Sequence, residues 1–201
     1  MDEHELIQAA CQGDLNSFNR LVLAYQDLVY NQAYRMLGEA DAAEDATQEA
    51  FISAFQHIKT FRGGSLRAWL LRIVTNITYD ELRRRKRQPT ASLEPFDKDG
   101  DEIESPFWIA DTAATPEEMA EHMELQQAIQ RCIDKLPAEF KAVVILIDVQ
   151  GMDYFEAAEV LKKPLGTIKS RLARARMRLR ECLQSVWELL PEALRLDHKG
   201  S

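Results

Sequence analysis

Residues 154–183, YFEAAEVLKKPLGTIKSRLARARMRLRECL, constrain the fold more than any other stretch of the chain. Apolar residues recur at helical spacing over 155–161, and Asp153 stands just before them as a candidate N-cap. The KKPLG sequence at 162–166 then interrupts the pattern, because proline and glycine together punctuate helices. Thr167 is a candidate cap for the helix that follows. The stretch therefore predicts two helices joined by a tight turn.

The second of these helices has one apolar and one basic face. Its apolar stripe consists of Ile168, Leu172, Ala175, Leu179 and Leu183. Arginines recur on the other side at offsets of three and seven residues, so their guanidinium groups share a face. A helix-turn-helix protein inserts the first turns of such a helix into the DNA major groove, where arginine can donate two hydrogen bonds to guanine or phosphate. The expected DNA-binding residues are Thr167, Lys169, Ser170, Arg171, Arg174 and Arg178. The alternative is a solvated basic face on an ordinary surface helix.

The distribution of charge matters more here than its sum. The 201-residue chain has a formal net charge of −8, which by itself argues against nucleic-acid binding. Basic residues nevertheless concentrate in 62–87 and 162–180, while acidic residues crowd 41–49 and 94–124. Because DNA responds to the local patch, the segregated charges remain compatible with a nucleic-acid partner.

Several functional classes are disfavoured by what the sequence lacks. Cys11, Cys132 and Cys182 are far apart and form no C-x-x-C pair, so we expect reduced thiols in a cytoplasmic protein, with no metal bound to them. The amino-terminal sequence MDEHELIQAA is unlike a secretory signal, and no apolar run is long enough to span a bilayer, so no direct membrane insertion is expected.

An enzyme is also disfavoured. The four histidines are scattered, and there is no nucleophile elbow, phosphate-cradling glycine loop or metal-ligand spacing. We expect no catalytic residues, no cofactor and no metal site.

The N-terminal part carries helical patterns over 5–37, 41–59 and 66–86. Gly38 is a candidate C-terminal cap for the first of them, and Ser65 is a candidate N-cap for the third. The helix at 41–59 is expected to bury Phe51, Ala54, Phe55 and Ile58. Its other face carries Asp41, Glu44, Asp45, Gln48 and Glu49.

This acidic face has three possible explanations. Like charges at i, i+4 spacing repel by a few tenths of a kcal/mol per pair, so the face either is solvated or waits for a basic partner. A carboxylate metal site at Asp45 and Glu49 is the third alternative, although no histidine shares the face.

In the helix at 66–86, Trp69 falls on the apolar face with Leu70, Ile73 and Ile77, which favours a core position for it. From Thr90 to Thr115 the pattern dissolves into an acidic, linker-like composition that includes the apolar run Phe107-Trp108-Ile109. A helix then follows from Pro116 to Lys135. The β-branched run 143–147 fits a strand or a helix, and the helical neighbours favour the helix. The predicted fold is all-α, with two small helical domains joined by a flexible acidic linker, the second containing a helix-turn-helix.

Three blocks of the chain, in this order, resemble sigma factors of the extracytoplasmic-function type, in the sigma-70 family of bacterial RNA polymerase. DAAEDATQEAFISAF (41–55) is similar to the family's core-binding helix, and TFRGGSLRAWLLRIVTN (60–76) to the loop and helix that recognise and melt the −10 promoter element. Residues 136–181 resemble the domain that binds the −35 element. The resemblance divides the chain into region 2 (1–89), the linker (90–115), region 4 (116–185) and a C-terminal tail (186–201).

The resemblance also assigns partners. The acidic face of 41–49 would bind the clamp helices of the polymerase's largest subunit, region 4 would meet the flap of the second-largest subunit, and the acidic residues 97–104 would thread the active-site cleft. The −10 residues would be Phe61, Arg62, Gly63, Gly64 and Ser65 around a flipped base, with Arg72, Asn76, Tyr79 and Arg83 along the opened strand.

The expected activity is that of a non-catalytic subunit that directs promoter-specific initiation and is regulated by an anti-sigma factor. The rival interpretations are a free-standing helix-turn-helix repressor or activator, which would bind duplex DNA alone, and an enzyme.

Overall fold

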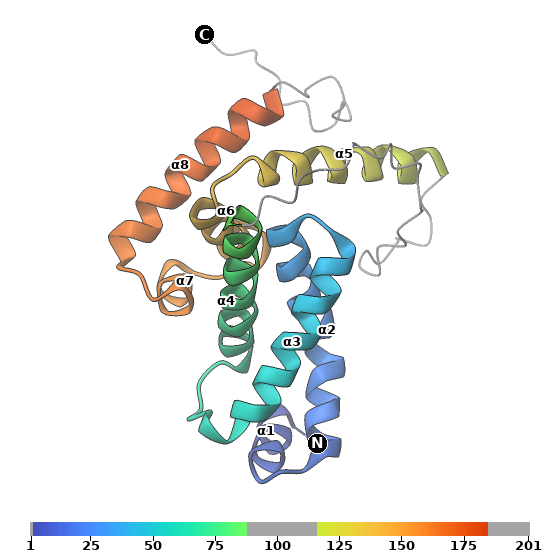
Figure 1. Cartoon of the computed structure of the whole chain (residues 1–201), viewed down its shortest axis with the longest axis vertical. Helices are drawn as coiled ribbons and strands as arrows, with labels where there is room; N and C mark the ends of the chain where they lie inside the picture. Colours follow the sequence, from blue (N-terminus) through green and yellow to red (C-terminus); the bar gives the residue numbers. More distant parts are fainter. Residues whose placement is uncertain (1, 88–115, 185–201) are drawn as a thin grey trace.

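The computed structural model describes residues 2–87 and 116–184, and all the regular structure in these ranges is helical (Figure 1). This confirms the all-α prediction. The expected linker at 90–115, with its run 107–109, and the expected tail at 186–201 lie outside the described residues. The helices are α1 (Glu3–Cys11), α2 (Leu15–Leu37), α3 (Ala40–His57), η1 (Ile58–Thr60), α4 (Leu66–Arg87), α5 (Pro116–Asp134), α6 (Ala138–Val144), η2 (Ile145–Val149), α7 (Tyr154–Leu161) and α8 (Leu165–Gln184).

The N-terminal unit is a bundle of α2, α3 and α4 with α1 across one end (Figure 1). The buried side of α3 is a stripe of small residues, Ala43, Ala46, Ala50 and Ala54. Because this stripe faces the bundle, Phe55 is turned toward the surface. It is 44% exposed and packs edge-to-face on Phe18, with ring centroids 5.0 Å apart. The prediction that Phe55 is buried is therefore wrong.

Local capping signals fix the ends of several helices as expected. Gly38 ends α2 in the left-handed conformation, at φ 77°, and its N–H donates to the Tyr34 carbonyl. At the start of α4, the Ser65 hydroxyl accepts a hydrogen bond from the Ala68 N–H at 3.1 Å. Asp153 accepts from the N–H groups of Phe155 and Glu156 at the start of α7, which completes a capping box.

The turn between α7 and α8 is shorter than the sequence pattern suggested. Lys162 takes the left-handed conformation, at φ 50°, and the Lys163 N–H closes back onto the Ala158 carbonyl at 3.1 Å. Helix α8 already begins at Leu165, because the Pro164 carbonyl accepts the Thr167 N–H at 2.9 Å. Thr167 therefore lies inside the helix, and its prediction as the N-cap is wrong.

The β-branched run 143–147 is helical, as favoured. Residues 143–146 are fully buried where α6 continues into the π-helical turn η2. Burial in the core thus outweighs the strand preference of these residues. Gly151, at φ 69°, follows the end of this segment.

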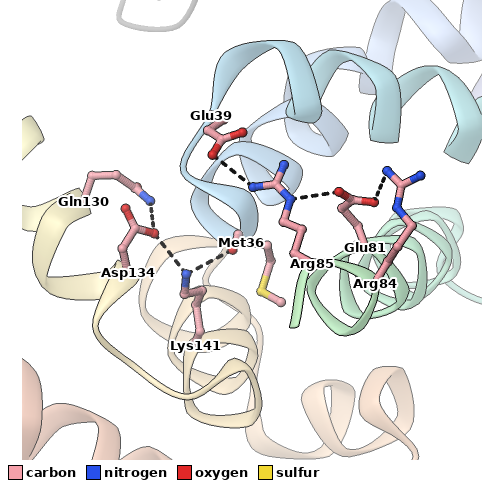
Figure 2. Close-up of polar contacts among 8 residues, drawn as sticks. All are labelled: Met36, Glu39, Glu81, Arg84, Arg85, Gln130, Asp134 and Lys141. Carbon is pink, nitrogen blue, oxygen red and sulfur yellow. Dashed lines mark hydrogen bonds and ion pairs between the residues drawn. The ribbon is translucent and has the colours of Figure 1, made fainter. Parts of the chain in front are cut away.

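The second unit packs on the C-terminal end of α2 through a polar contact that we call the joint. It consists of Arg35 and Met36 from α2, Gln126, Gln130 and Asp134 from α5, and Lys141 from α6. The Lys141 ammonium donates to the Met36 carbonyl at 3.1 Å and to Asp134 Oδ1 at 3.0 Å (Figure 2). The Arg35 guanidinium donates to the side-chain oxygens of Gln126 at 2.8 Å and Gln130 at 3.1 Å.

One cysteine pair also departs from expectation. Cys132 in α5 and Cys182 in α8 form a disulfide with their Cα atoms 5.7 Å apart, whereas Cys11 is a free thiol. The prediction of reduced thiols is thus wrong for this pair. The two residues are 50 positions apart, and only the packing of α5 against α8 brings them together.

The left-handed Lys162 generates a stability prediction. A non-glycine residue in this conformation costs about 1–2 kcal/mol, and glycine recovers most of it despite its greater freedom in the unfolded chain. We expect Lys162→Gly to raise the free energy of unfolding by about 0.5–1 kcal/mol in denaturant titration. Lys163→Gly removes the same charge at a position without positive φ and is the matched control. It should be neutral or destabilising, and equal effects at both positions would contradict the explanation.

Candidate nucleic-acid and protein interface

The loop between η1 and α4 forms one wall of a surface hollow of about 550 Å³. Five of the predicted −10 residues, Phe61, Arg62, Gly63, Gly64 and Ser65, line it together with Arg72 from α4. Both glycines have positive φ, at 92° and 89°, and no atom lies where a Cβ would project from either. The backbone of this loop is therefore open to a flat ligand, with an aromatic ring and two arginines beside it.

Trp69 belongs to this hollow, which the sequence interpretation missed. Its ring is half-buried, lines the hollow and lies against the Phe61 ring, with centroids 5.4 Å apart at 59°. The helical pattern placed Trp69 among apolar neighbours and so favoured the core. The signal that could have revealed it is the position of Trp69 one turn after Ser65, where α4 is still next to the loop.

The opposite wall of the hollow comes from the second unit. Glu156, Glu159 and Val160 of α7 line it, so two carboxylates face the basic loop. Nearby, the Arg67 guanidinium donates to the Gln150 carbonyl, which holds α4 to the segment before α7. The loop that is predicted to take up a base is thus partly covered in this conformation.

The other predicted −10 residues lie further along α4 and do not line the hollow. Asn76 and Arg83 are exposed, and Arg83 forms an ion pair with Asp80 at 3.2 Å. Tyr79 is half-buried against the second unit. Burial raises the pKa of Tyr79 to about 12, and the nearby Arg171 guanidinium opposes this rise. Tyr79 and Arg171, which are predicted to contact different promoter elements, therefore lie close together here.

On α8, the predicted −35 residues differ in how exposed they are and in which side chains they contact. Arg174 and Arg178 are exposed, and the Arg178 guanidinium lies 5.2 Å from the centroid of the Phe140 ring. Arg171 is half-buried and pairs with Glu139 at 3.0 Å.

The first turns of α8 are supported from within the helix-turn-helix. The Lys169 ammonium lies 5.8 Å from the centroid of the Tyr154 ring, and the Ser170 hydroxyl donates to the Thr167 carbonyl. Arg176, which was not predicted, donates to the Asp148 carboxylate at 2.5 and 3.0 Å. The basic face therefore combines exposed guanidinium groups with others that are already fixed by the domain.

The acidic face of α3 is exposed to solvent. All five predicted residues, Asp41, Glu44, Asp45, Gln48 and Glu49, are exposed. Its field reaches α2, where burial raises the pKa of Tyr30 and the charges of Glu44 and Asp41 raise it further. Asp45 and Glu49 also line a groove of about 400 Å³ between α3 and α4.

The C-terminal end of α4, which carries several basic residues, lies beside this face. Glu81 lies between Arg84, at 2.7 Å, and Arg85, at 2.8 Å, and Arg85 also reaches Glu39 at 3.1 Å (Figure 2). The hydrogen bond from Arg85 lowers the pKa of Glu81. These pairs occupy the end of α4 and leave the exposed side of α3 to solvent.

Among the side chains that the structure describes, in 2–87 and 123–184, no group of three or more histidine, cysteine or acidic residues is arranged to hold a metal ion. None of the helices in these ranges has the length and apolarity needed to cross a bilayer.

Comparisons with known proteins identify the family of the chain. Residues 21–88 match the family described as Sigma-70 region 2, and residues 126–179 match Sigma-70, region 4. The chain is 35% identical over 181 residues to the ECF RNA polymerase sigma factor SigW of Bacillus subtilis, covering 90% of this chain and 96% of that protein. It is 38% identical over 172 residues to ECF sigma factor SigE of Mycolicibacterium smegmatis, covering 86% of this chain but 63% of the relative's length.

A solved structure agrees as well. The sigma factor RpoE of Bartonella quintana, in a co-crystal structure with the anti-sigma factor NepR, superposes with a TM-score of 0.64 at 27% identity, covering 85% of this chain and 98% of that one. Two sigma-70 regions in order, together with a full-length relative at 35% identity, carry the assignment. The chain therefore belongs to the sigma-70 family, among the extracytoplasmic-function sigma factors of RNA polymerase.

Proposed function

We propose that this chain binds core RNA polymerase through α3 and directs initiation by recognising a −35 element with α8 and a −10 element with the loop at 61–65. Sigma factors are non-catalytic specificity subunits, so binding surfaces carry the whole activity. The observation that supports the proposal most directly is the hollow beside Gly63 and Gly64, which has an aromatic wall, basic side chains and backbone open to a flat ligand.

The charge of each surface indicates which partner it binds. The five side chains of the acidic face suit the basic clamp helices of the largest polymerase subunit, and a complementary potential of this kind speeds encounter. We propose region 2 as residues 1–89, the linker as 90–115, region 4 as 116–185 and the tail as 186–201. Region 4 would meet the flap of the second-largest subunit.

At the −10 element, the proposed roles follow the geometry. A flipped base would enter the hollow and stack against Phe61 or Trp69, while Arg62 and Arg72 neutralise the adjacent phosphates. Asn76, Tyr79 and Arg83 would follow the opened strand along α4. Ser65 caps the helix and so fixes the start of α4 next to the loop.

At the −35 element, α8 would enter the major groove with Thr167, Lys169 and Ser170 in its first turns. Arg171, Arg174 and Arg178 would follow along one face. The Glu139, Asp148 and Tyr154 contacts hold the helix in its domain while Arg174 remains exposed to the duplex.

We infer that the structure represents a closed form that cannot occupy a whole promoter. The −10 loop and α7 line the same hollow. Elements centred at −35 and −10 are separated by about 25 base pairs, or roughly 85 Å at 3.4 Å per pair. The joint between α2 and the second unit must therefore open before both elements can be bound.

Regulation by an anti-sigma partner is part of the proposal. The Bartonella quintana relative is found in complex with such a factor. Here the acidic face of α3 and the basic face of α8 are both exposed, so one inhibitor with a basic and an acidic segment could cover them. The chain would act in the cytoplasm, where its polymerase is.

Charge reversal tests core binding. We expect the double variant Glu44→Lys, Asp45→Lys to lower affinity for sigma-free core polymerase at least about tenfold, and to abolish promoter-dependent run-off transcription, because it places two cations opposite basic clamp helices. The matched control, Glu124→Lys with Glu181→Lys, makes the same change in net charge at exposed positions off α3. Wild-type core affinity in the α3 variant would contradict the role of α3. No association of the wild-type chain with core, alongside tight binding of duplex DNA by the chain alone, would favour a free-standing repressor instead.

A single arginine tests the −35 role. We expect Arg174→Ala to weaken binding to a −35 duplex by about 5- to 150-fold, equivalent to about 1–3 kcal/mol if the side chain contacts a base. Arg180 is exposed six residues further on, hence on another face of the helix, and Arg180→Ala should change affinity much less. Fluorescence anisotropy at fixed salt measures both, and equal losses would argue for unspecific attraction.

The closed form is tested at Lys141. Replacing a buried ammonium that donates to Met36 and Asp134 by methionine should open the joint, since a charged hydrogen bond contributes about 1.5–3 kcal/mol. We expect Lys141→Met to raise the radius of gyration in small-angle scattering and to tighten core binding several-fold, because less free energy is spent on opening. Lys59→Met, at an exposed site in η1, controls for the lost charge. An unchanged radius with normal helicity would contradict this role of Lys141.

A further inference from the structure

The disulfide between Cys132 and Cys182 joins two helices that no role in polymerase or DNA binding requires to be linked. Cys132 is 2% exposed and belongs to the face of α5 that packs inward, whereas Cys182 is half-buried near the end of α8. The two sulfurs therefore differ in access. A small reagent reaches Cys182 first and Cys132 only from within the pair.

The surroundings of Cys182 favour reaction there. The Lys135 ammonium lies 3.8 Å from its sulfur. A neighbouring cation stabilises the thiolate, which is the form of cysteine that attacks oxidants and disulfides. Cys11, the remaining cysteine, instead donates its S–H to the Ile58 carbonyl and is 47 positions from that partner in the N-terminal unit. Only one of the two sites thus combines access, a cation and a second sulfur.

We propose that Cys132 and Cys182 form a reversible oxidation site that takes a peroxide as its oxidant and braces α8 against α5 when oxidised. The Cys182 thiolate attacks a peroxide oxygen, the O–O bond breaks, and a sulfenic acid forms at Cys182. The Cys132 thiol then attacks this sulfur, the S–S bond forms and water leaves. In total two thiols lose two electrons and two protons, and hydrogen peroxide becomes two molecules of water. A dithiol reductant reverses the step by exchange at the half-buried Cys182 sulfur, the more accessible of the two.

The location of the pair determines what the brace does. In α8 the fully buried residues are Ile168, Leu172 and Ala175, so the core holds its first half. Beyond Ala175, the partly buried side chains are Leu179, Cys182 and Leu183, while Arg176 and Arg178 make surface contacts with Asp148 and Phe140. The disulfide is the covalent tie on this second half. It leaves the first turns, about 18 Å away at 1.5 Å per residue, free for DNA.

Two observations favour a switch over a permanent bond. Reducing systems keep cytosolic thiols reduced, so a bond with one accessible sulfur is expected to turn over there. The pair also lies within region 4, so its oxidation state changes the stability of that domain without blocking the acidic face of α3. The cytosolic setting rests on the proposed function, whereas the chemistry of the pair does not.

The full-length chain is first reduced with dithiothreitol, then exposed to hydrogen peroxide, alkylated and digested without reductant for mass spectrometry. We expect a peptide cross-linked between Cys132 and Cys182 that disappears in a glutathione buffer at the cytosolic ratio of reduced to oxidised forms. Hydrogen exchange at residues 179–184 should be at least about tenfold slower in the oxidised chain. The midpoint of thermal unfolding of region 4 should be about 10 °C higher, because the bond closes a long loop.

Variants separate the possible outcomes. Cys11→Ser should behave as the wild type, and Cys132→Ser should trap a sulfenic acid at Cys182 that dimedone labels. Persistence of the bond in the glutathione buffer would show a permanent structural disulfide, and cross-links to Cys11 or between chains would show unselective oxidation. Either result overturns the proposal, as does equal hydrogen exchange in the two forms.

A separate arm concerns DNA. Oxidised and reduced wild type are compared for binding of a −35 duplex over a temperature series, and the oxidised form should retain binding about 5–10 °C higher. If neither form binds a −35 duplex at any temperature, even when assembled with core polymerase, the proposed function fails while the cross-link result stands. If both bind identically although the cross-link forms, the brace is overturned.

Discussion

The C-terminal end of α2 is the constraint on which the arrangement of the two units depends. A helix leaves its last carbonyl groups without intrahelical partners, and buried ones must be satisfied. Here Gly38 turns the chain away and supplies one N–H, while Gln130 donates to the Arg35 carbonyl and Lys141 to the Met36 carbonyl. The helix end also carries partial negative charge, which suits the Lys141 ammonium. Because these donors come from α5 and α6, the contacts that satisfy one helix end also position the second unit, and with it α7, against the loop at 61–65.

Segregation of charge then decides which surfaces remain available to partners. Asp45 and Glu49 of α3 line one groove with Arg84 of α4, yet Arg84 pairs with Glu81 instead. Arg85 likewise pairs with Glu81 and Glu39. The four carboxylates of this face, Asp41, Glu44, Asp45 and Glu49, are exposed and pair with neither of these arginines. In α8 the same principle works with opposite sign, because Glu139 and Asp148 hold Arg171 and Arg176 while Arg174 projects outward. At each surface, ion pairs within the chain fix some charged side chains, while other charged side chains stay exposed and can contact a partner.

Helix ends that depend on neighbouring residues were predictable, whereas contacts between residues far apart in the chain were not. Asp153, Ser65 and Gly38 act within four residues of their partners, so their capping roles followed from pattern alone. Thr167 failed because Pro164 starts α8 earlier than a cap preference indicates. Phe55 was misplaced since helical periodicity cannot tell the alanine-lined face of α3 from the aromatic one beside it. Trp69 packs against the core as favoured, but its second contact, with Phe61 at the hollow, was not foreseen. The joint and the Cys132–Cys182 bond unite residues 50 to 105 positions apart, and no spacing rule reaches that far.

The strength of the joint suggests an order of events. Four hydrogen bonds connect the end of α2 to α5 and α6. At about 0.5–3 kcal/mol each, with the larger values for charged partners, they give a closed form favoured by several kcal/mol. A −35 duplex bound at micromolar affinity supplies about 8 kcal/mol in total, so an opening cost of this size would consume much of it. Core polymerase bound at nanomolar affinity supplies about 12 kcal/mol, which exceeds the free energy needed to open the joint. Under the proposed function, the same contact that completes a helix end would therefore weaken promoter binding by the free chain and favour it after assembly with the polymerase.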